Sequence, residues 1–310
     1  MPQPTEQLPA INAERLKSAI SRELDSALAS ALPSALYIVA TPIGNLGDVT
    51  LRSLVVLMQA DRVYCEDTRI SQRLLARFDI GRKLFTYHEH NADVIRPDIL
   101  DALAKNQRIA LISDAGTPAS SDPGFKLVRA VIEAGHDVVP IPGASAIIAA
   151  ISAAGLATDR FLFSGFLAQK QGARRKQLSE LVEIDATLVF FESPHRLSAT
   201  LSDMVSAFPQ RSAVIARELT KRFEELKRGP LPELAEWSAS TPVRGEVTIL
   251  VAPPDAKSSD DIDDDVIEDR LRLALVDLPP SRAAKTVADA LGVPRARVYE
   301  IGLSLKRDDG

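Results

Sequence analysis

The sequence predicts an α/β protein with two lobes and a small helical tail. At 310 residues the chain exceeds the usual size of a single domain. From residue 36 to residue 155, short apolar, β-rich runs alternate with helical patterns. Near residue 253 a Pro-Pro pair and an acidic run precede a short helical region. These observations predict five segments: an N-terminal extension (1–34), a first lobe (35–157), a second lobe (158–253), a linker (254–265) and a tail (266–310).

The N-terminal extension predicts one helix. Its apolar residues fall every fourth position, which forms a narrow stripe suited to packing on the body or on a partner chain. These residues are Leu16, Ile20, Leu24, Leu28 and Leu32.

The sequence of the first lobe predicts a mostly parallel sheet covered by helices on both faces, because its expected strands are apolar along their whole length. In chain order, the expected strand and helix pairs are LYIVA with 50–60, RVYCE with 69–78, KLFTY with 92–105, RIALIS with 124–134 and HDVVPI with 144–154. In such sheets ligands bind beyond the carboxyl ends of the strands.

Three Gly/Pro loops follow strands of this lobe: TPIGN after the first, SDAGTPASSDPG after the fourth and PIPGASA after the fifth. None is a GxGxxG or GxxxxGK[ST] motif, which removes the usual signal of a dinucleotide or P-loop site. GASA lacks the second glycine of the hydrolase motif GxSxG, which disfavours a serine hydrolase. Together the loops offer backbone groups that can approach a flat or zwitterionic ligand.

The second lobe predicts a mixed sheet, since its strands are separated by fewer helices. The tail contains three short helical segments punctuated by Pro280, Gly292 and Pro294, a pattern typical of a helix-turn-helix.

Composition narrows the class of protein. Cys65 is the one cysteine, so no internal disulfide forms, and no Cys/His set with zinc spacing occurs. No apolar run reaches the roughly 20 residues of a membrane span, and the N-terminus lacks a signal-peptide pattern. We therefore expect a cytoplasmic protein without a membrane partner. The net charge is −5, but residues 255–269 alone contribute −7, which leaves about +2 elsewhere.

Two segments contain candidate polar groups at strand ends. Glu66, Asp67 and Arg69 follow the second strand, where they either cap the next helix or orient a substrate and assist proton removal. Glu192, His195 and Arg196 arrive together after a fully apolar strand. A third segment, His88-Glu89-His90, has two imidazoles but no third ligand nearby, so we expect a loop and no metal.

Basic residues cluster in three stretches: around Arg174 and Arg175, between 217 and 228, and between 282 and 297. They form either ordinary solvated faces or, if they share one side, a surface that binds phosphates.

The ordered motifs VATPIGNLGDVTLRSLVVLMQADRVYCEDTRISQRLL, LISDAGTPASSDPG, PIPGASA, FFESPHR and ARELTKRFEE resemble the ribosomal RNA small subunit methyltransferase I family, part of the tetrapyrrole methylase superfamily. The resemblance covers about residues 36–252, and the tail resembles the family's helix-turn-helix extension. It implies two α/β lobes with S-adenosylmethionine between them, a homodimer, and methylation of a cytidine ribose 2′-hydroxyl in the decoding region of 16S ribosomal RNA. No DNA partner is implied.

The resemblance also implies roles for particular residues. Pro42 would line the cofactor cleft, and Asp114, Ala115 and Gly116 would meet the methionine portion. Ser145 and Ala146 match a second contact loop, and Glu192 would lie near the adenosine. Groups expected on the substrate side are Asp67, as the first candidate for a general base, with Glu66, Arg69, His195, Arg196 and Lys221. The basic cluster in the sequence, and not the resemblance, is the reason to expect that Arg174 and Arg175 bind RNA.

Two other functions are compatible with parts of this pattern. A methyltransferase for a tetrapyrrole or another small molecule would use the same cleft, although the EDTR and ESPHR segments and the basic tail favour RNA. A non-catalytic regulator would sense a ligand with its α/β body and bind nucleic acid with its tail.

Overall fold

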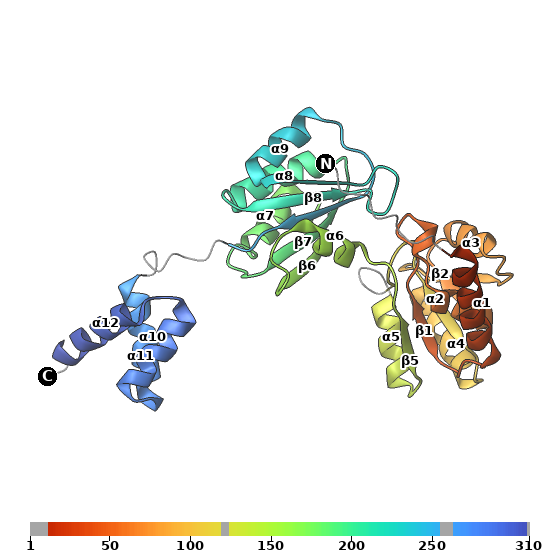
Figure 1. The fold of residues 1–310 in the computed structure, drawn as a ribbon, viewed down its shortest axis with the longest axis horizontal. Helices are drawn as coiled ribbons and strands as arrows, with labels where there is room; N and C mark the ends of the chain where they lie inside the picture. Colours follow the sequence, from red (N-terminus) through yellow and green to blue (C-terminus); the bar gives the residue numbers. More distant parts are fainter. Residues whose placement is uncertain (1–11, 119–123, 255–262, 309–310) are drawn as a thin grey trace, which may run out of the picture.

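A computed structural model describes residues 12–118, 124–254 and 263–308 of the protein. Two sheets, each flanked by helices, and a separate group of three helices make up the described chain (Figure 1). Residues 1–11 of the predicted extension and residues 255–262 of the predicted linker lie outside the described residues.

The first sheet has five strands in the order β3-β2-β4-β1-β5, and every pairing is parallel. Its strands are β1 (Leu36–Val39), β2 (Arg62–Cys65), β3 (Leu84–Thr86), β4 (Ile109–Ile112) and β5 (Val138–Ile141). The predicted strands and their parallel arrangement are confirmed.

Helices cover both faces of this sheet, as predicted. They are α2 (Leu51–Gln59), α3 (Thr68–Arg77), α4 (Ala92–Ala104) and α5 (Gly124–Glu133), with a short 3-10 turn, η1 (Leu46–Asp48). Leu57 of α2 and Leu75 of α3 are fully buried in one core, and Ile99 of α4 and Leu127 of α5 in the other. Two buried faces explain why the strands are apolar without alternation.

The next helix, α6 (Ala146–Ala154), belongs by packing to the second sheet. Its buried Ala150 and Ile151 share a core with Val189 and Val214 of that sheet. The chain therefore passes from one lobe to the other before α6, and not after residue 157, where the sequence pattern puts the boundary.

The second sheet is mixed, as predicted, with the order β6-β7-β10-β8-β9. Its strands are β6 (Phe161–Phe166), β7 (Thr187–Glu192), β8 (Ser212–Arg217), β9 (Glu225–Pro230) and β10 (Val247–Val251). The β6–β7 pairing is parallel and the others are antiparallel. Three helices, α7 (Gln171–Ser179), α8 (Leu197–Ala207) and α9 (Leu231–Ser240), cover the face opposite α6.

Helix α1 (Ala13–Ala29) contains no buried residue, and Leu16 of its apolar stripe is 59% exposed. Contact with the body is made at its carboxyl end. The Gln59 side chain donates to the Ser30 carbonyl (3.1 Å) and accepts from the Leu32 backbone N–H (2.9 Å).

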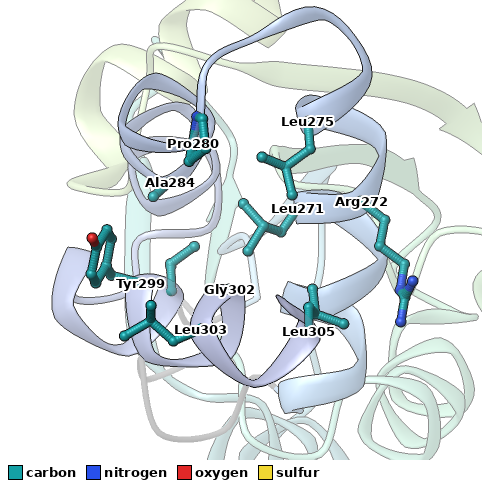
Figure 2. Close-up of a pocket in the computed structure, with 10 residues that line it drawn as sticks. Leu271, Arg272, Leu275, Pro280, Ala284, Tyr299, Gly302, Leu303 and Leu305 are labelled. Atoms are coloured by element: carbon teal, nitrogen blue, oxygen red, sulfur yellow. The ribbon is translucent and has the colours of Figure 1, made fainter. Parts of the chain in front are cut away.

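The tail has its own core, formed by α10 (Asp264–Asp277), α11 (Pro280–Leu291) and α12 (Arg295–Asp308). Gly292 ends α11 with φ +65°, a left-handed conformation that glycine adopts without strain. The tail has a mostly aliphatic groove of about 360 Å³. Figure 2 shows the residues that line it, with the Arg272 head group pointing away from the groove. Among the described residues, no helix has both the length and the apolar character needed to cross a bilayer.

Candidate active site

The three Gly/Pro loops, apart from residues 119–123, which lie outside the described residues, meet at one edge of the first sheet, because β4, β1 and β5 are neighbouring strands. Thr41 and Gly116 exchange backbone hydrogen bonds of 2.9 and 3.0 Å, which join the first loop to the second. The Thr117 hydroxyl donates to the Ala144 carbonyl (3.2 Å) and joins the second loop to the third. The loops therefore form one connected surface.

Glycine is required at two positions of this surface. Gly116 has φ +81°, which disfavours a side chain. At Gly143 a Cβ atom would lie 2.8 Å from the Cβ of Ala40, so a larger residue would push the third loop away from the first.

A cavity of about 580 Å³ lies over these loops and extends to the second sheet. Its lining includes, from the first lobe, Ile43, Glu66, Asp114 and Gly116, and, from the second, Phe166, Phe191, Glu192 and Val247. This volume falls within the roughly 300–1,000 Å³ that is typical of small-molecule sites.

Most of the residues expected at a cofactor meet at this cavity. Its lining residues include Asp114, Ala115, Gly116, Ser145, Ala146 and Glu192. Pro42 is half-buried in the first loop and does not belong to the lining, where its neighbour Ile43 takes part. The sequence motifs therefore predicted a set of residues that the fold brings together.

Asp114 presents a carboxyl group to the cavity directly after β4. Burial raises its pKa, the nearby charge of Asp67 adds to this effect, and a hydrogen bond from the backbone N–H of Asp67 (3.0 Å) opposes it. A partly desolvated carboxylate of this kind favours a cationic ligand group.

Asp67 itself faces α3. Its carboxylate accepts the Arg69 backbone N–H (2.8 Å), which caps the helix, and forms an ion pair with the Arg69 side chain (2.6 Å). The hydrogen bonds from the Arg69 side chain and backbone lower the pKa of Asp67 to about 2. Glu66, unlike Asp67 and Arg69, lines the cavity.

Glu192 is buried at the end of β7. Its carboxylate accepts hydrogen bonds from the Thr200 hydroxyl (2.6 Å) and from the backbone N–H of Ser193 (2.7 Å). Arg196 lies 3.4 Å from it and donates to the Leu167 carbonyl (2.7 Å), so this guanidinium connects the ends of β6 and β7. His195 is exposed beside them and does not line the cavity.

Lys221 joins the two lobes. Its Nζ lies 2.9 Å from Glu218 and 3.0 Å from Glu246, and its aliphatic stem fills the space beside Gly44 of the first loop. Burial lowers the pKa of Lys221, but the hydrogen bonds to the two carboxylates outweigh it and raise the pKa overall. Lys221 is thus a paired ammonium, unsuited to act as a neutral base.

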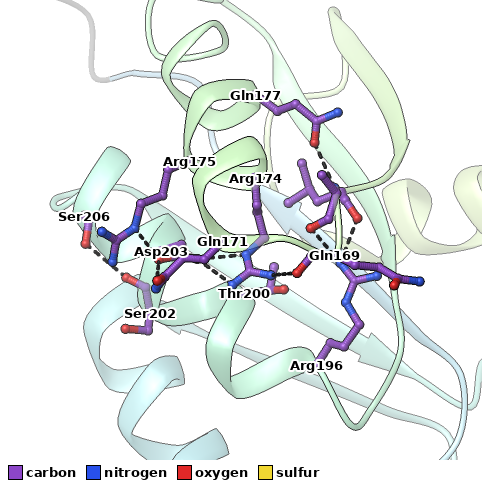
Figure 3. A network of polar contacts seen from close by, with 12 residues as sticks. Gln169, Gln171, Arg174, Arg175, Gln177, Arg196, Thr200, Ser202, Asp203 and Ser206 are labelled. Atoms are coloured by element: carbon purple, nitrogen blue, oxygen red, sulfur yellow. Dashed lines mark hydrogen bonds and ion pairs between the residues drawn. The ribbon is translucent and has the colours of Figure 1, made fainter.

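Arg174 is placed differently from the sequence expectation. Its side chain is buried in the second lobe, where it forms an ion pair with Asp203 of α8 (2.6 Å) and donates to the Gln169 carbonyl (Figure 3). Arg175 binds the other carboxylate oxygen (2.7 Å) with its side chain 57% exposed. The expectation that Arg174 contacts RNA is therefore corrected: this buried guanidinium holds α7 against α8.

The rings of His88 and His90 lie with their centroids 6.0 Å apart in a loop after β3. Within the described part of the chain, no group of three or more His, Cys, Asp or Glu side chains is arranged to hold a metal ion.

Two aromatic residues of the cavity, Phe166 and Phe191, were missed by the sequence reasoning. Both occur in apolar strands, where aromatic residues usually form core. The signal that could have identified Phe166 is Gly165, because an isolated glycine in a strand indicates a bulge.

Comparison with known proteins agrees with this geometry. Residues 35–235 match the family described as Tetrapyrrole (Corrin/Porphyrin) Methylases, and residues 260–306 match the RsmI C-terminal HTH domain. The chain is 49% identical to the Ribosomal RNA small subunit methyltransferase I of Mesorhizobium japonicum, over 90% of this chain and 95% of the relative. The protein of the same name from Neisseria meningitidis serogroup A is 40% identical, over 92% of this chain and 98% of the relative.

Solved structures show the same fold at low sequence identity. A cobalt precorrin-4 methyltransferase aligns with a TM-score of 0.52 and 19% identity, over 70% of this chain and 94% of that chain. The uroporphyrin-III C-methyl transferase of Thermus thermophilus, complexed with S-adenyl homocysteine, aligns with the same TM-score and identity over 70% and 97%. The two-lobed tetrapyrrole methylase fold is thus confirmed, and the chain belongs to the ribosomal RNA small subunit methyltransferase I family.

Proposed function

We propose that this protein transfers the methyl group of S-adenosylmethionine to the 2′-hydroxyl of a cytidine ribose in the decoding region of 16S ribosomal RNA, within the small ribosomal subunit. The observation that carries the proposal is the cavity between the lobes. It occurs in a chain that is 49% and 40% identical to two proteins named Ribosomal RNA small subunit methyltransferase I, over about nine-tenths of its length. Family membership disfavours the non-catalytic regulator, since those relatives are named as enzymes.

The residues of the cavity fit S-adenosylmethionine. Asp114 offers a partly desolvated carboxylate to the ammonium group of the methionine portion, and the backbone of Ala115 and Gly116 lies beside it. Ser145, Ala146 and Glu192 line the remainder and suit the adenosine portion. When bound, this cofactor supplies an electrophilic methyl carbon on a sulfonium.

The chain's own contribution is mainly positioning. The three connected loops hold the donor side in place, and the acceptor oxygen must come within about 3–3.5 Å of the methyl carbon, in line with the bond that breaks. With the cofactor bound, an O–C bond would form as the C–S bond breaks, S-adenosylhomocysteine would be released, and the hydroxyl proton would pass to a base. Of the groups predicted on the substrate side, Glu66 is the carboxylate that lines the cavity, which favours it over Asp67 as proton acceptor.

RNA would be held by exposed cations of the second lobe and of the tail. Lys170 and Lys176 of the second lobe and Arg282 and Lys285 of the tail are exposed. Contacts of this kind bind phosphates without reading sequence. By family resemblance, we include a homodimer and a cytoplasmic location in the proposal.

The test is incubation of the purified protein with labelled S-adenosylmethionine and small ribosomal subunits from a strain lacking this gene. Nuclease digestion and mass spectrometry then locate the label. The expected result is label on one ribose 2′-oxygen. Binding of the cofactor without any label, while a control methyltransferase modifies the same particles, would favour a small-molecule acceptor instead.

A further inference from the structure

The edge strand β6 carries an aromatic ring that no part of the proposed chemistry uses. We propose that Phe166, supported by Phe191, is a stacking platform for the unpaired nucleobase of the acceptor nucleotide. This inference rests on the proposed function and deepens it, because it assigns the recognition of the base to a particular side chain.

A bulge turns Phe166 toward the cavity. Phe163 pairs with Val189, whereas Phe166 pairs with Phe191, so β6 uses one residue more than β7 over the same length. In a regular strand residues 163 and 166 would point to opposite faces. The extra residue brings Phe166 to the face of Phe163, and Gly165, with φ +64°, allows the turn.

The ring of Phe166 contacts another aromatic ring on one side, and much of its remaining surface is exposed. Phe191 contacts it with ring centroids 5.7 Å apart, and Phe163 contacts Phe191 at 4.9 Å. Phe163 and Phe191 are half-buried, but Phe166 lines the cavity while 59% exposed. Three rings arranged in this way keep the outer one in place at little entropic cost, so that it can stack on a flat ring.

The position favours a base of the RNA over the adenine of the cofactor. The groups suited to the cofactor belong to the connected loops and to buried Glu192, whereas Phe166 lies on an edge strand and is reachable from solvent. Lys170 follows four residues later, within about 14 Å even for a fully extended chain, and is exposed. An open aromatic ring beside cations is the usual arrangement for binding single-stranded RNA.

The experiment measures methylation kinetics on small subunits and the affinity for S-adenosylhomocysteine by calorimetry, for the wild type, Phe166→Ala and Phe166→Trp. Phe161→Ala is the matched control, since Phe161 lies on the same strand, is exposed and does not line the cavity. For Phe166→Ala we expect kcat/KM for subunits to fall about 5- to 150-fold, mainly through KM, with S-adenosylhomocysteine binding within about twofold of the wild type. Phe166→Trp and Phe161→Ala should remain near wild type.

Three results would overturn the proposal. If the wild type is active and Phe166→Ala has unchanged kinetics, the stacking proposal is wrong, while the proposed function still stands. A loss of S-adenosylhomocysteine affinity that equals the loss of activity would assign the ring to the adenine of the cofactor. A wild type that binds S-adenosylhomocysteine but methylates no subunits would remove the proposed function, and the platform with it.

Discussion

The backbone N–H of Asp67 donates a 3.0 Å hydrogen bond to the carboxylate of Asp114, which joins the loop after β2 to the loop after β4. The carboxylates of the two aspartates have different contacts. Asp67 uses its own carboxylate to cap α3 and to bind Arg69, while Asp114 presents its carboxylate to the cavity. The relationship separates a group that orders the loop from one that can meet a ligand.

Replacement of Asp114 by Asn should weaken cofactor binding. The amide keeps an oxygen for the Asp67 N–H but loses the charge offered to an ammonium group, and a hydrogen bond to a charged group contributes about 1.5–3 kcal/mol. We expect the Kd for S-adenosylhomocysteine, measured by calorimetry, to rise roughly 10- to 150-fold. Asp67→Asn is the matched control and should bind normally; equal losses in both variants would point to disruption of the loop.

Glu66→Gln should lower the rate of the chemical step, because Glu66 is the cavity carboxylate on the substrate side. Loss of a general base reduces the rate by about 10²- to 10⁴-fold. Single-turnover methylation with saturating subunits and cofactor measures this step. Asp67→Asn should leave it near normal, since a pKa of about 2 makes Asp67 a weak base. A rate loss confined to Asp67→Asn would reverse the assignment.

The salt dependence of RNA binding should distinguish exposed from paired cations. Lys170→Gln and Lys176→Gln should each reduce the slope of log K against log salt by about 0.7 for every phosphate that the variant no longer neutralises. Lys221→Met should leave the slope unchanged, because Glu218 and Glu246 already neutralise this ammonium. Filter binding to subunits over a range of salt concentrations provides the measurement. A smaller slope for Lys221→Met would place that residue on the RNA surface.

Asp203→Asn should destabilise the second lobe by about 3–5 kcal/mol, since it leaves the buried guanidinium of Arg174 without its counter-charge. Arg174→Met should cost less, because Asp203 keeps Arg175 and Gln171 as partners. Urea unfolding followed by circular dichroism gives both values. If the Arg174 variant proved the less stable of the two, packing of that side chain would matter more than its charge.

Acid should remove the contribution of the same ion pairs. Burial of Asp203 raises its pKa, but the hydrogen bonds from Arg175, Arg174 and Gln171 outweigh it, so the folded pKa lies below the ordinary value. A depressed carboxyl pKa stabilises the folded state fully above the unfolded value of about 3.9 and loses this effect as the pH falls toward the folded value. The free energy of unfolding should therefore drop below about pH 4, and less so in Asp203→Asn. Equal pH profiles of the wild type and Asp203→Asn would show that Asp203 does not contribute to the loss of stability in acid.

Local pattern was sufficient for much of the fold and failed at identifiable places. The apolar strands of the first lobe and the helices between them follow from period and turn residues. β9 was missed because residues 225–230 (ELKRGP) form a polar edge strand without apolar alternation. The packing of α6 was missed because an apolar helix matches either sheet equally well, and only the three-dimensional arrangement decides which one it covers.

The sequence by itself determined the class of the fold, the loops at the strand ends and, through its motifs, the family. Tertiary structure decided which side chains face the cavity and which form ion pairs or hydrogen bonds with other residues of the protein. Arg174 and Asp203 are 29 residues apart, and Phe166 faces the cavity because of a bulge measured against a neighbouring strand. Charge pairing and strand register depend on partner residues distant in the chain. A local pattern can indicate a bulge, as Gly165 does, but it does not identify the partner, whereas hydrophobic period and turn chemistry are local and can be read directly.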